Sequence, residues 1–429
     1  MFHVQNLNSS RHLNYYFYDD SSLTIHMKVT YLHQYFNTLN MPGGTRSYEM
    51  ARRLVAMGHE VNMVTAWREA DGRKGWFVTD EAGIKVHWLP VPYSNRMGFG
   101  ERIRAFFQFA LRSAQRAAAL DADIVFATST PLTIALPAVY AARRRKVPMV
   151  FEVRDLWPDV PHAMGALNNK FVFWAAERLE KFAYRTSAHV IALTPTMRDF
   201  VSGKGIPLSK ITSIPNLANL DAFQMGRKQQ DGRKTILYCG NLGPAHGPEY
   251  LVELAKYFHD HGLNIKIEVI GGGKLLDALI QTSTDHGCID RTISFHGPKP
   301  KNQVSDFYLG ADATIMTITD CELLYRHSVQ NKFFDSLAAG KPVIANYRGY
   351  ASELAEIMNA GLIVERDDIG AAATKIASYL ADQERVFQAG ANARKLAEGE
   401  FDAEMLAQRL ERVFLSVLSD NSGKPKVNI

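Results

Sequence analysis

The sequence predicts an α/β protein with two doubly wound domains that face each other across a cleft, each a parallel sheet with helices on both faces. Short apolar runs typical of buried strands alternate with amphipathic segments of helical period. This alternation stops at a polar stretch, residues 216–234, and then starts again. A length of 429 residues also exceeds what one hydrophobic core usually holds.

The first half of the chain supplies the first expected domain, residues 27–216. Strands are expected within residues 27–36, 83–91, 122–129, 147–153 and 188–194, and after the sequence GHE at residues 58–60. The glycine loop MPGG leads from the first strand into a helix expected from about Arg46 to Met57. Short links between strands and helices indicate parallel pairing. Residues 1–26 are interpreted as an N-terminal extension, because Met27 stands directly before the first strand pattern.

The second half repeats the pattern in a second expected domain, residues 235–400. The apolar runs TILYCGNLG, IKIEVIGGG, TISFHG, ADATIMT and PVIAN alternate with helical segments. Residues 217–234 are interpreted as the linker between the domains. Residues 401–420 are amphipathic and predict a C-terminal helix that can pack back across the domain junction, followed by a tail at residues 421–429.

The composition is that of a globular protein, with 46% hydrophobic and 22% charged residues. The three cysteines, Cys239, Cys288 and Cys321, form neither a metal pattern nor a disulfide framework, which favours a reduced, cytoplasmic setting. No apolar run approaches the roughly 20 residues of a membrane span. The first 26 residues lack the apolar core of a signal peptide. No nucleic-acid recognition motif is present, so no nucleic-acid partner is expected.

The positive charge is concentrated between residues 91 and 150. This segment holds nine Lys or Arg against three acids, a net +6, whereas the whole chain carries +5. A helix is expected near residues 101–119, with one apolar stripe formed by Ile103, Phe106, Phe107, Ala110 and Ala114. One interpretation is a helix packed on the sheet with a solvated basic face. The other is a helix that rests on the anionic headgroups of a membrane.

Three glycine-rich loops follow expected strands, where doubly wound sheets bind their ligands. They contain Gly43 and Gly44, then residues 240–247, then residues 271–273. Each loop alone is explained by a tight turn. Three such loops, all between a strand and a helix, favour a phosphate-bearing ligand held by backbone amides in the cleft.

A fourth candidate segment is HSVQNKFFDSLAAGKPVIAN, residues 327–346. Its AAGK lacks the spacing of a phosphate-binding P-loop, so any phosphate contact is expected at the start of its helix. Ser328 or Asn331 is expected to cap that helix. Lys332 suits a diphosphate, and Asp335, one turn further, suits a ribose diol. The alternative is a surface salt pair on a capped helix.

These motifs, in this order, resemble glycosyltransferase family 4, whose members are retaining enzymes with the GT-B fold. The similar segments are YCGNLGPAHG, VIGGG, FHGPKPKNQVSDFYLGADATIM and NKFFDSLAAGKPVIA, together with the MPGG loop of the first half. The segment FEVRDLWPD, residues 151–159, resembles the variant in O-antigen and capsule transferases such as those for N-acetylfucosamine. The resemblance covers about residues 27 to 418.

The resemblance implies roles for individual residues. The first of two acids in the family falls on His327 and the second, which contacts the ribose, on Asp335. The Arg and Lys of the diphosphate loop fall on Asn241 and His246, so Lys332 is expected to supply much of the positive charge.

The His–Asp pair of the first domain falls on Arg154 and Asp155. Arg154 suits a phosphate, with structural pairing to Asp155 or Glu152 as the alternative. The expected catalytic residues are Arg154, Asp155 and Lys332. The expected donor-binding residues are Gly43, Gly44, Asn241, His246, Gly271, Gly273, Gly297, His327, Ser328, Asn331 and Asp335.

The implied activity is a retaining transfer of an N-acetylated deoxyhexose or hexosamine from a nucleotide-diphosphate donor. UDP is the expected nucleotide, and no metal or other cofactor is expected. The implied acceptor is a lipid-linked saccharide of surface polysaccharide synthesis at the inner face of the bacterial membrane, reached through the basic helix near residues 101–119. Two alternatives stay open: a GT-B nucleotide-sugar epimerase, and a non-catalytic family member that only binds nucleotide.

Overall fold

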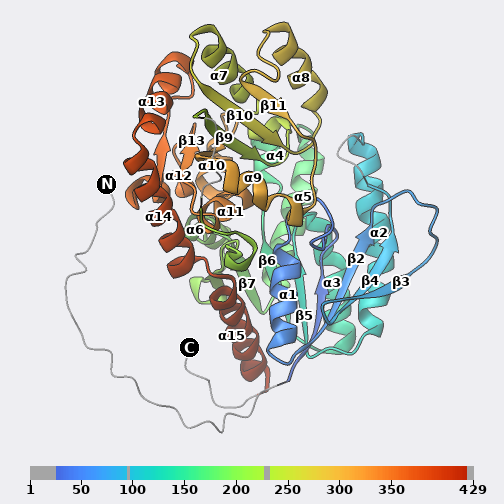
Figure 1. Cartoon of the computed structure of the whole chain (residues 1–429). Helices are drawn as coiled ribbons and strands as arrows, with labels where there is room; N and C mark the ends of the chain where they lie inside the picture. Colours follow the sequence, from blue (N-terminus) through green and yellow to red (C-terminus); the bar gives the residue numbers. More distant parts are fainter. Residues whose placement is uncertain (1–25, 94–96, 227–231, 423–429) are drawn as a thin grey trace, which may run out of the picture.

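The computed structural model describes residues 26–93, 97–226 and 232–422, which form two α/β domains with a helix that crosses between them (Figure 1). The expected extension at residues 1–26 and the expected tail at residues 421–429 lie almost entirely outside the described residues. Part of the expected linker, residues 227–231, also lies outside them.

The first domain is built on a sheet with the strand order β3-β4-β2-β1-β5-β6-β7-β8. Its strands are β1 (Lys28–Leu32), β2 (Glu60–Trp67), β3 (Phe77–Glu81), β4 (Ile84–Pro90), β5 (Ile124–Thr128), β6 (Met149–Val153), β7 (His189–Ala192) and β8 (Ile211–Ser213). Its helices are α1 (Arg46–Ala56), α2 (Phe99–Ala119), α3 (Ala135–Arg145), α4 (Asp159–Ala163), α5 (Lys170–Thr186) and α6 (Pro195–Gly203).

Every strand pair of this sheet is parallel except β3 with β4. The sequence pattern did not indicate β3, because its five residues alternate between partly buried and exposed at the sheet edge. The turn Ala82-Gly83, with φ angles of 56° and 81°, joins β3 to β4 as a hairpin. The central strands are buried on both faces and read as continuous apolar runs, as expected for a parallel sheet.

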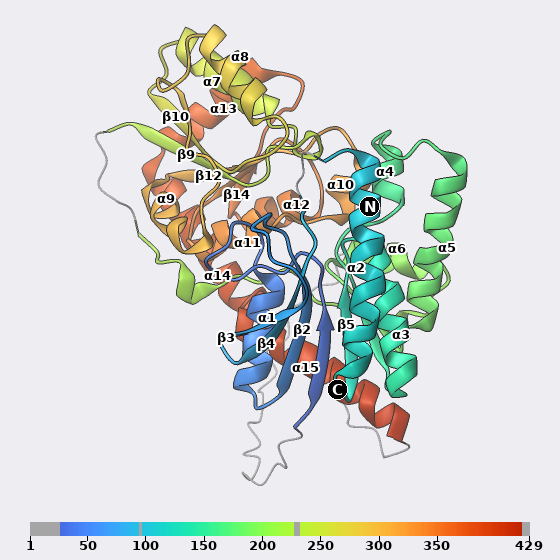
Figure 2. The same ribbon diagram turned by 90° about the vertical axis from the view of Figure 1, so that its right-hand side faces the viewer.

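Helices cover both faces of the first sheet. One face packs against α1, through Met50 and Leu54, and the opposite face packs against α2, α3, α5 and α6. Figure 2 shows α2, α3 and α5 side by side on that second face. The predicted buried stripe of α2 is partly wrong, because Phe107 is 46% exposed and Phe109 is buried in its place. Arg116 is not a free basic group, since its guanidinium contacts His87 Nδ1 at 2.8 Å.

The second domain has a fully parallel sheet with the order β11-β10-β9-β12-β13-β14. Its strands are β9 (Lys234–Cys239), β10 (Ile265–Ile270), β11 (Ile293–Phe295), β12 (Ala313–Met316), β13 (Val343–Ala345) and β14 (Gly361–Ile363). Its helices are α7 (Glu249–Asp260), α8 (Leu276–Asp285), α9 (Ser305–Gly310), α10 (Glu322–His327), α11 (Asn331–Ala338), α12 (Tyr350–Ile357), α13 (Ile369–Ala381) and α14 (Gln383–Glu400). Two parallel α/β domains confirm the predicted fold class.

The last helix, α15 (Ala403–Ser422), leaves the second domain and packs on the first (Figure 1). Its side chains Leu406, Leu410 and Phe414 join the core that also contains α1. The rings of Phe414 and Phe126 lie 5.2 Å apart between centroids. The chain therefore crosses between the domains twice. Among the described residues, no helix combines the length and the apolar character needed to cross a bilayer.

Candidate functional site

A cavity of about 650 Å³ lies between the two domains, at the carboxyl ends of strands from both sheets. Ligands of doubly wound folds bind at this edge of the sheet. Most of the predicted site residues line this cavity: Gly43, Gly44, Arg154, Asp155, Asn241, His246, Gly271, Ser328, Asn331, Lys332 and Asp335. The fold therefore brings together residues as far apart in the sequence as Gly43 and Asp335.

Three predicted donor-binding residues do not line the cavity. A side chain at Gly273 would meet the Leu242 carbonyl oxygen at 2.5 Å, so this glycine serves loop packing. Gly297 accepts a hydrogen bond from the Gly271 amide at 3.0 Å. The His327 ring packs on Phe200 with centroids 5.2 Å apart, toward the first domain rather than into the cavity.

Lys332 is the most unusual group of the cavity. Its side chain comes from the first turn of α11, is 6% exposed, and its Nζ lies 3.5 Å from the centre of the Tyr238 ring. Among the described residues this amine has no hydrogen-bond or ion-pair partner. Burial lowers the pKa of Lys332 to about 7. A cationic group kept without a counter-ion is suited to an anionic ligand, which would supply the missing partner.

The start of α11 also differs from the prediction. Gln330 is the N-cap residue and no side chain caps the helix, so the predicted capping by Ser328 or Asn331 is wrong. Asn331 is instead the first helical residue, and Ser328 ends the preceding helix α10. The Gln330 side chain turns away from α11, because its Nε2 donates to His246 Nδ1 and to the Thr317 carbonyl. An uncapped helix start at the cavity wall is favourable for a phosphate.

Asp335 lies one turn after Lys332 and has a partner that the sequence did not indicate. Lys301 Nζ contacts Asp335 Oδ2 at 2.5 Å, and both side chains are largely buried in the cavity wall. The pair fixes one carboxylate oxygen, which leaves the other oxygen for a ligand hydroxyl. This geometry is compatible with the predicted ribose contact.

The glycine loops bring backbone close to the cavity. A Cβ atom at Gly271 would lie 1.8 Å from the Gly240 carbonyl oxygen, so only glycine allows these two strand ends to touch. A Cβ atom at Gly44 would lie 2.5 Å from Asn331 Nδ2, which shows that the first-domain loop directly approaches the start of α11. His246 contributes no charge, because burial and the nearby Lys332 lower its pKa to about 3.

Arg154 and Asp155 lie on the first-domain wall, after β6. The Arg154 Nη1 atom lies 3.4 Å from His33 Nε2. Burial and the charge of Arg154 lower the pKa of His33 well below its usual value, so the imidazole is neutral. Asp155 Oδ2 accepts a hydrogen bond from Thr130 Oγ1 at 2.6 Å.

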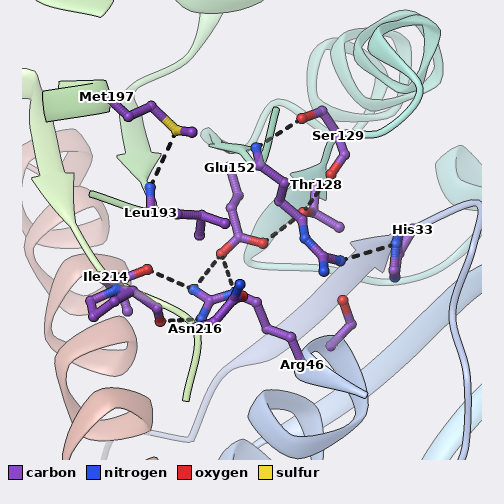
Figure 3. A network of polar contacts seen from close by, with 12 residues as sticks. His33, Arg46, Thr128, Ser129, Glu152, Leu193, Met197, Ile214 and Asn216 are labelled. Carbon is purple, nitrogen blue, oxygen red and sulfur yellow. Dashed lines mark hydrogen bonds and ion pairs between the residues drawn. The ribbon is translucent and has the colours of Figure 1, made fainter. Parts of the chain in front are cut away.

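The structure does not show the alternative prediction for Arg154, a structural ion pair with Asp155 or Glu152. Glu152 is paired instead with the buried Arg46, whose Nη2 lies 2.7 Å from Glu152 Oε1 (Figure 3). Burial raises the pKa of Glu152, but Arg46, with smaller contributions from the charge of Arg154 and the Thr128 hydroxyl, holds it below the usual value. Within the described ranges Arg154 has no carboxylate partner. Its guanidinium is therefore available to a ligand.

Sequence reasoning missed several cavity residues. They are His33, Tyr35, Asn37, Asn216, Lys299, Lys301 and Gln330. His33, Tyr35 and Asn37 follow β1 in the segment HQYFN, at the carboxyl end of a central strand. Ligands of doubly wound folds bind at this end of the strands, so the position alone could have identified them as candidate site residues. Lys301 begins the short 3-10 turn before α9, and its contribution depends on how this turn lies beside α11, which no local pattern encodes.

Comparison with known proteins agrees with the fold. Residues 43–217 match the family described as Glycosyl transferase 4-like domain, and residues 222–396 match Glycosyl transferases group 1. The structure of HepE from Anabaena in complex with UDP and glucose superposes with a TM-score of 0.68 and 16% identity, covering 91% of this chain and 100% of that chain. At this identity the likeness concerns the fold.

Two curated relatives are similar over part of their length. The putative colanic acid biosynthesis glycosyl transferase WcaI of Escherichia coli is 25% identical over 54% of this chain and 63% of its own length. The GDP-mannose-dependent alpha-(1-6)-phosphatidylinositol monomannoside mannosyltransferase of Mycobacterium tuberculosis is 26% identical over 50% of this chain and 58% of its own length. The chain thus spans less than two-thirds of either relative.

The paired domains and the cleft between them define a protein built to hold a ligand between two doubly wound sheets. The chain belongs to the GT-B glycosyltransferases, with a family 4-like first domain and a group 1 second domain.

Proposed function

We propose that this protein transfers an N-acetylated deoxyhexose or hexosamine, with retention of configuration, from a UDP-sugar to a lipid-linked glycan of surface polysaccharide synthesis. The observation that carries the proposal is the buried Lys332 amine beside the uncapped start of α11, in a cavity between the two domains. The N-acetylfucosamine type is favoured by the segment FEVRDLWPD, which places Arg154 and Asp155 at the cavity.

The donor side of the proposed reaction is carried by the second domain. The bond between the sugar C1 and the diphosphate oxygen breaks, and negative charge grows on the leaving UDP. Lys332, Lys301 and the α11 amides are fixed beside the space where this charge would develop, and fixed dipoles and cations there lower the barrier. Asp335 holds the ribose through its free carboxylate oxygen.

The acceptor side is carried by the first domain. A bond forms between the sugar C1 and an acceptor hydroxyl oxygen, on the face that the diphosphate leaves. The hydroxyl proton passes to an oxygen of the departing phosphate, so no side chain is required as the base. Arg154 offsets phosphate charge, and Asp155, oriented by Thr130, positions the acceptor. No metal is needed in this scheme.

The proposed acceptor calls for a membrane-binding surface, and the exposed side chains of two first-domain helices support one. Large apolar side chains are exposed on α2 and α5, namely Phe107 and Leu111 on the first and Phe171 and Trp174 on the second, with Phe171 73% exposed. Arg104, Arg112, Lys170 and Arg178 are exposed among them. Aromatic groups flanked by cations suit an anionic lipid surface. We place the protein at the inner face of the bacterial membrane.

The test is the thermal stability of the protein with UDP, GDP, ADP and dTDP, each with and without EDTA. UDP at one hundred times its dissociation constant is expected to stabilise the fold by about 2.7 kcal/mol, and EDTA is expected to change nothing. Stabilisation by GDP alone would replace UDP as the proposed nucleotide. Loss of the shift with EDTA would contradict the metal-free scheme.

A non-catalytic, nucleotide-binding role is the second candidate. It is favoured by His327, which stands where the family carries an acid and packs on Phe200 outside the cavity. Incubation of a UDP-sugar with a lipid-diphosphate saccharide separates the two, because only a transferase releases UDP in proportion to acceptor consumed. Conversion of the sugar nucleotide without acceptor would instead indicate an epimerase.

A further inference from the structure

Helix α10 belongs to the second domain in sequence but packs on both domains. It lies beside α4 and α6 of the first domain (Figure 2). Its Leu323 and Leu324 side chains pack against the buried core of the first domain, and Leu324 also packs against the core of the second. A Cβ atom at Gly349 would lie 2.0 Å from the Tyr325 carbonyl oxygen, so the start of α12 touches α10 directly. The helix is therefore held from two sides.

Two threonine hydroxyl groups of the first domain bind the carboxyl end of α10. Thr194 Oγ1 donates to the His327 carbonyl at 3.0 Å. Thr196 Oγ1 donates to the Arg326 carbonyl at 2.7 Å. Thr194 is fully buried and is also the N-cap of α6, where its Oγ1 accepts from the Met197 amide at 2.9 Å. The last carbonyl groups of a helix have no partner inside that helix, so the first domain supplies partners for two of them.

A third side chain from the first domain binds the backbone between α10 and α11. Asn216 is 4% exposed, and its Nδ2 donates to the Val329 carbonyl at 3.2 Å. The backbone bound in this way, residues 326–329, leads directly into α11, and residues 328–332 line the cavity. Lys332 follows Val329 by only three positions. The contacts of the first domain therefore limit where the Lys332 amine and the first amides of α11 can lie.

We propose that Thr194, Thr196 and Asn216 are positioning residues of the donor site, which fix the start of α11 from the opposite domain. This inference rests on the proposed transferase function. The groups offered to the donor diphosphate, the Lys332 amine and the α11 amides, belong to the second domain. The hydrogen bonds that hold the preceding backbone come from the first domain. Neither threonine is among the described residues that line the cavity, so the effect of each on a bound nucleotide is indirect.

The test measures UDP affinity of the full chain by titration calorimetry. The double variant Thr194→Val with Thr196→Val removes both hydroxyl donors and keeps the side-chain shape. It is expected to weaken UDP binding at least about fivefold, the effect of one net hydrogen bond. Thr196→Val alone leaves the α6 cap intact and is expected to give a smaller loss. Thr194→Ser with Thr196→Ser keeps both donors and is expected to restore the affinity to within about twofold of wild type.

Thr186→Val is the matched control. The Thr186 hydroxyl also donates to a carbonyl at 2.7 Å, that of Phe182, but this hydrogen bond lies inside α5, away from α10. The control is expected to bind UDP with wild-type affinity. All variants are measured at a temperature well below their unfolding transitions, so that loss of stability alone does not change the affinity of the folded protein.

Three results would overturn the positioning role: unchanged UDP affinity in the double Val variant, an equal loss in Thr186→Val, or a loss that the double Ser variant does not restore. Failure of the proposed function shows separately, in the wild-type protein. A wild-type protein that binds GDP in place of UDP is tested with GDP and the same variants. A wild-type protein that binds none of UDP, GDP, ADP and dTDP would overturn the proposed transferase and this inference with it.

Discussion

At the scale of single residues, Lys332 shows how a site can be found from the cost of its burial. A lysine amine without a hydrogen-bond partner in a protein interior loses its hydration at a cost in free energy. Such a buried amine lowers the stability of the fold, which is expected of a group that is kept for binding an anionic ligand. The cation–π contact with Tyr238 offsets part of the lost hydration, and Lys332 lines the cavity.

The first prediction concerns the pH dependence of nucleotide binding. An ordinary lysine has a pKa of about 10.4, and burial lowers that of Lys332 to about 7. Between these values the unfolded chain binds the proton and the folded chain does not, so the contribution of Lys332 to stability rises with pH in this window. A bound diphosphate favours the charged amine. UDP binding is therefore expected to take up a proton and to weaken at least about tenfold between pH 7 and pH 9.

Calorimetry in two buffers with different ionisation enthalpies measures this proton uptake. The control is Lys332→Met, which keeps an apolar stem of similar length. It is expected to bind UDP about 10-fold to 100-fold more weakly at pH 7 without the pH dependence, and to unfold at an equal or higher temperature. A Met variant with the wild-type pH profile would rule out Lys332 as the titrating group.

The sequence predicted the residues with local signatures and missed those that depend on packing. Lys332 and Gly271 follow recognisable motifs and line the cavity. The pairing of Asp335 with Lys301 joins residues 34 positions apart, and the caps expected at Ser328 and Asn331 failed because Gln330 takes the N-cap position. Capping preferences are worth about 1 kcal/mol, so tertiary contacts such as that of Gln330 with His246 easily override them.

At the scale of secondary-structure elements, α2 has two apolar stripes rather than one. Helical periodicity indicated that the helix is amphipathic, but Phe107 and Leu111 lie on its exposed side while Phe106 and Phe109 face the sheet. A period of 3.6 residues cannot separate an apolar residue in the core from one on a second face. Only the packing of α3 beside α2 shows which stripe stays uncovered.

The second prediction tests whether the exposed aromatic side chains of α5, on the same face of the sheet as α2, bind membranes. Replacing Phe171 and Trp174 together by Ser is expected to weaken binding to vesicles of phosphatidylcholine with phosphatidylglycerol at least about tenfold, because two aromatic side chains no longer enter the interface. Vesicle co-sedimentation measures the effect. Phe387→Ser is the matched control, since this phenylalanine is 70% exposed on α14 of the second domain. Equal binding by all three proteins would contradict a membrane role for α5.

At the scale of the whole molecule, the repeated strand–helix pattern correctly predicted two α/β domains, but it could not predict how they are arranged. Their arrangement depends on α15, which continues from the second domain and completes the core of the first. The amphipathic pattern of α15 predicted that its apolar side packs against another part of the protein. The surface that α15 covers is formed by α1 and by the sheet beside Phe126. These segments are distant from α15 in the sequence, so no local pattern identifies them.

The third prediction is that α15 is an integral part of the first domain. Phe414 is fully buried, so Phe414→Ala is expected to destabilise the protein by about 3–5 kcal/mol, seen as a lower urea midpoint. Phe387→Ala, at an exposed site, is expected to change the free energy of unfolding by less than about 0.5 kcal/mol. Similar midpoints for both variants would mean that α15 contributes no core to the first domain.

The two chain crossings between the domains lie side by side, which limits how the molecule can move. The Ala218 amide donates to the Phe401 carbonyl at 2.7 Å, and Arg46, already paired with Glu152, also donates to the carbonyl groups of Ile214 and Pro215. Further contacts join the domains away from these crossings, because Thr194 and Thr196 of the first domain donate to the carbonyl groups of His327 and Arg326 in α10. A movement of one domain on the other would therefore have to break hydrogen bonds at the crossings or at α10, so the walls of the cavity are held in place from more than one side.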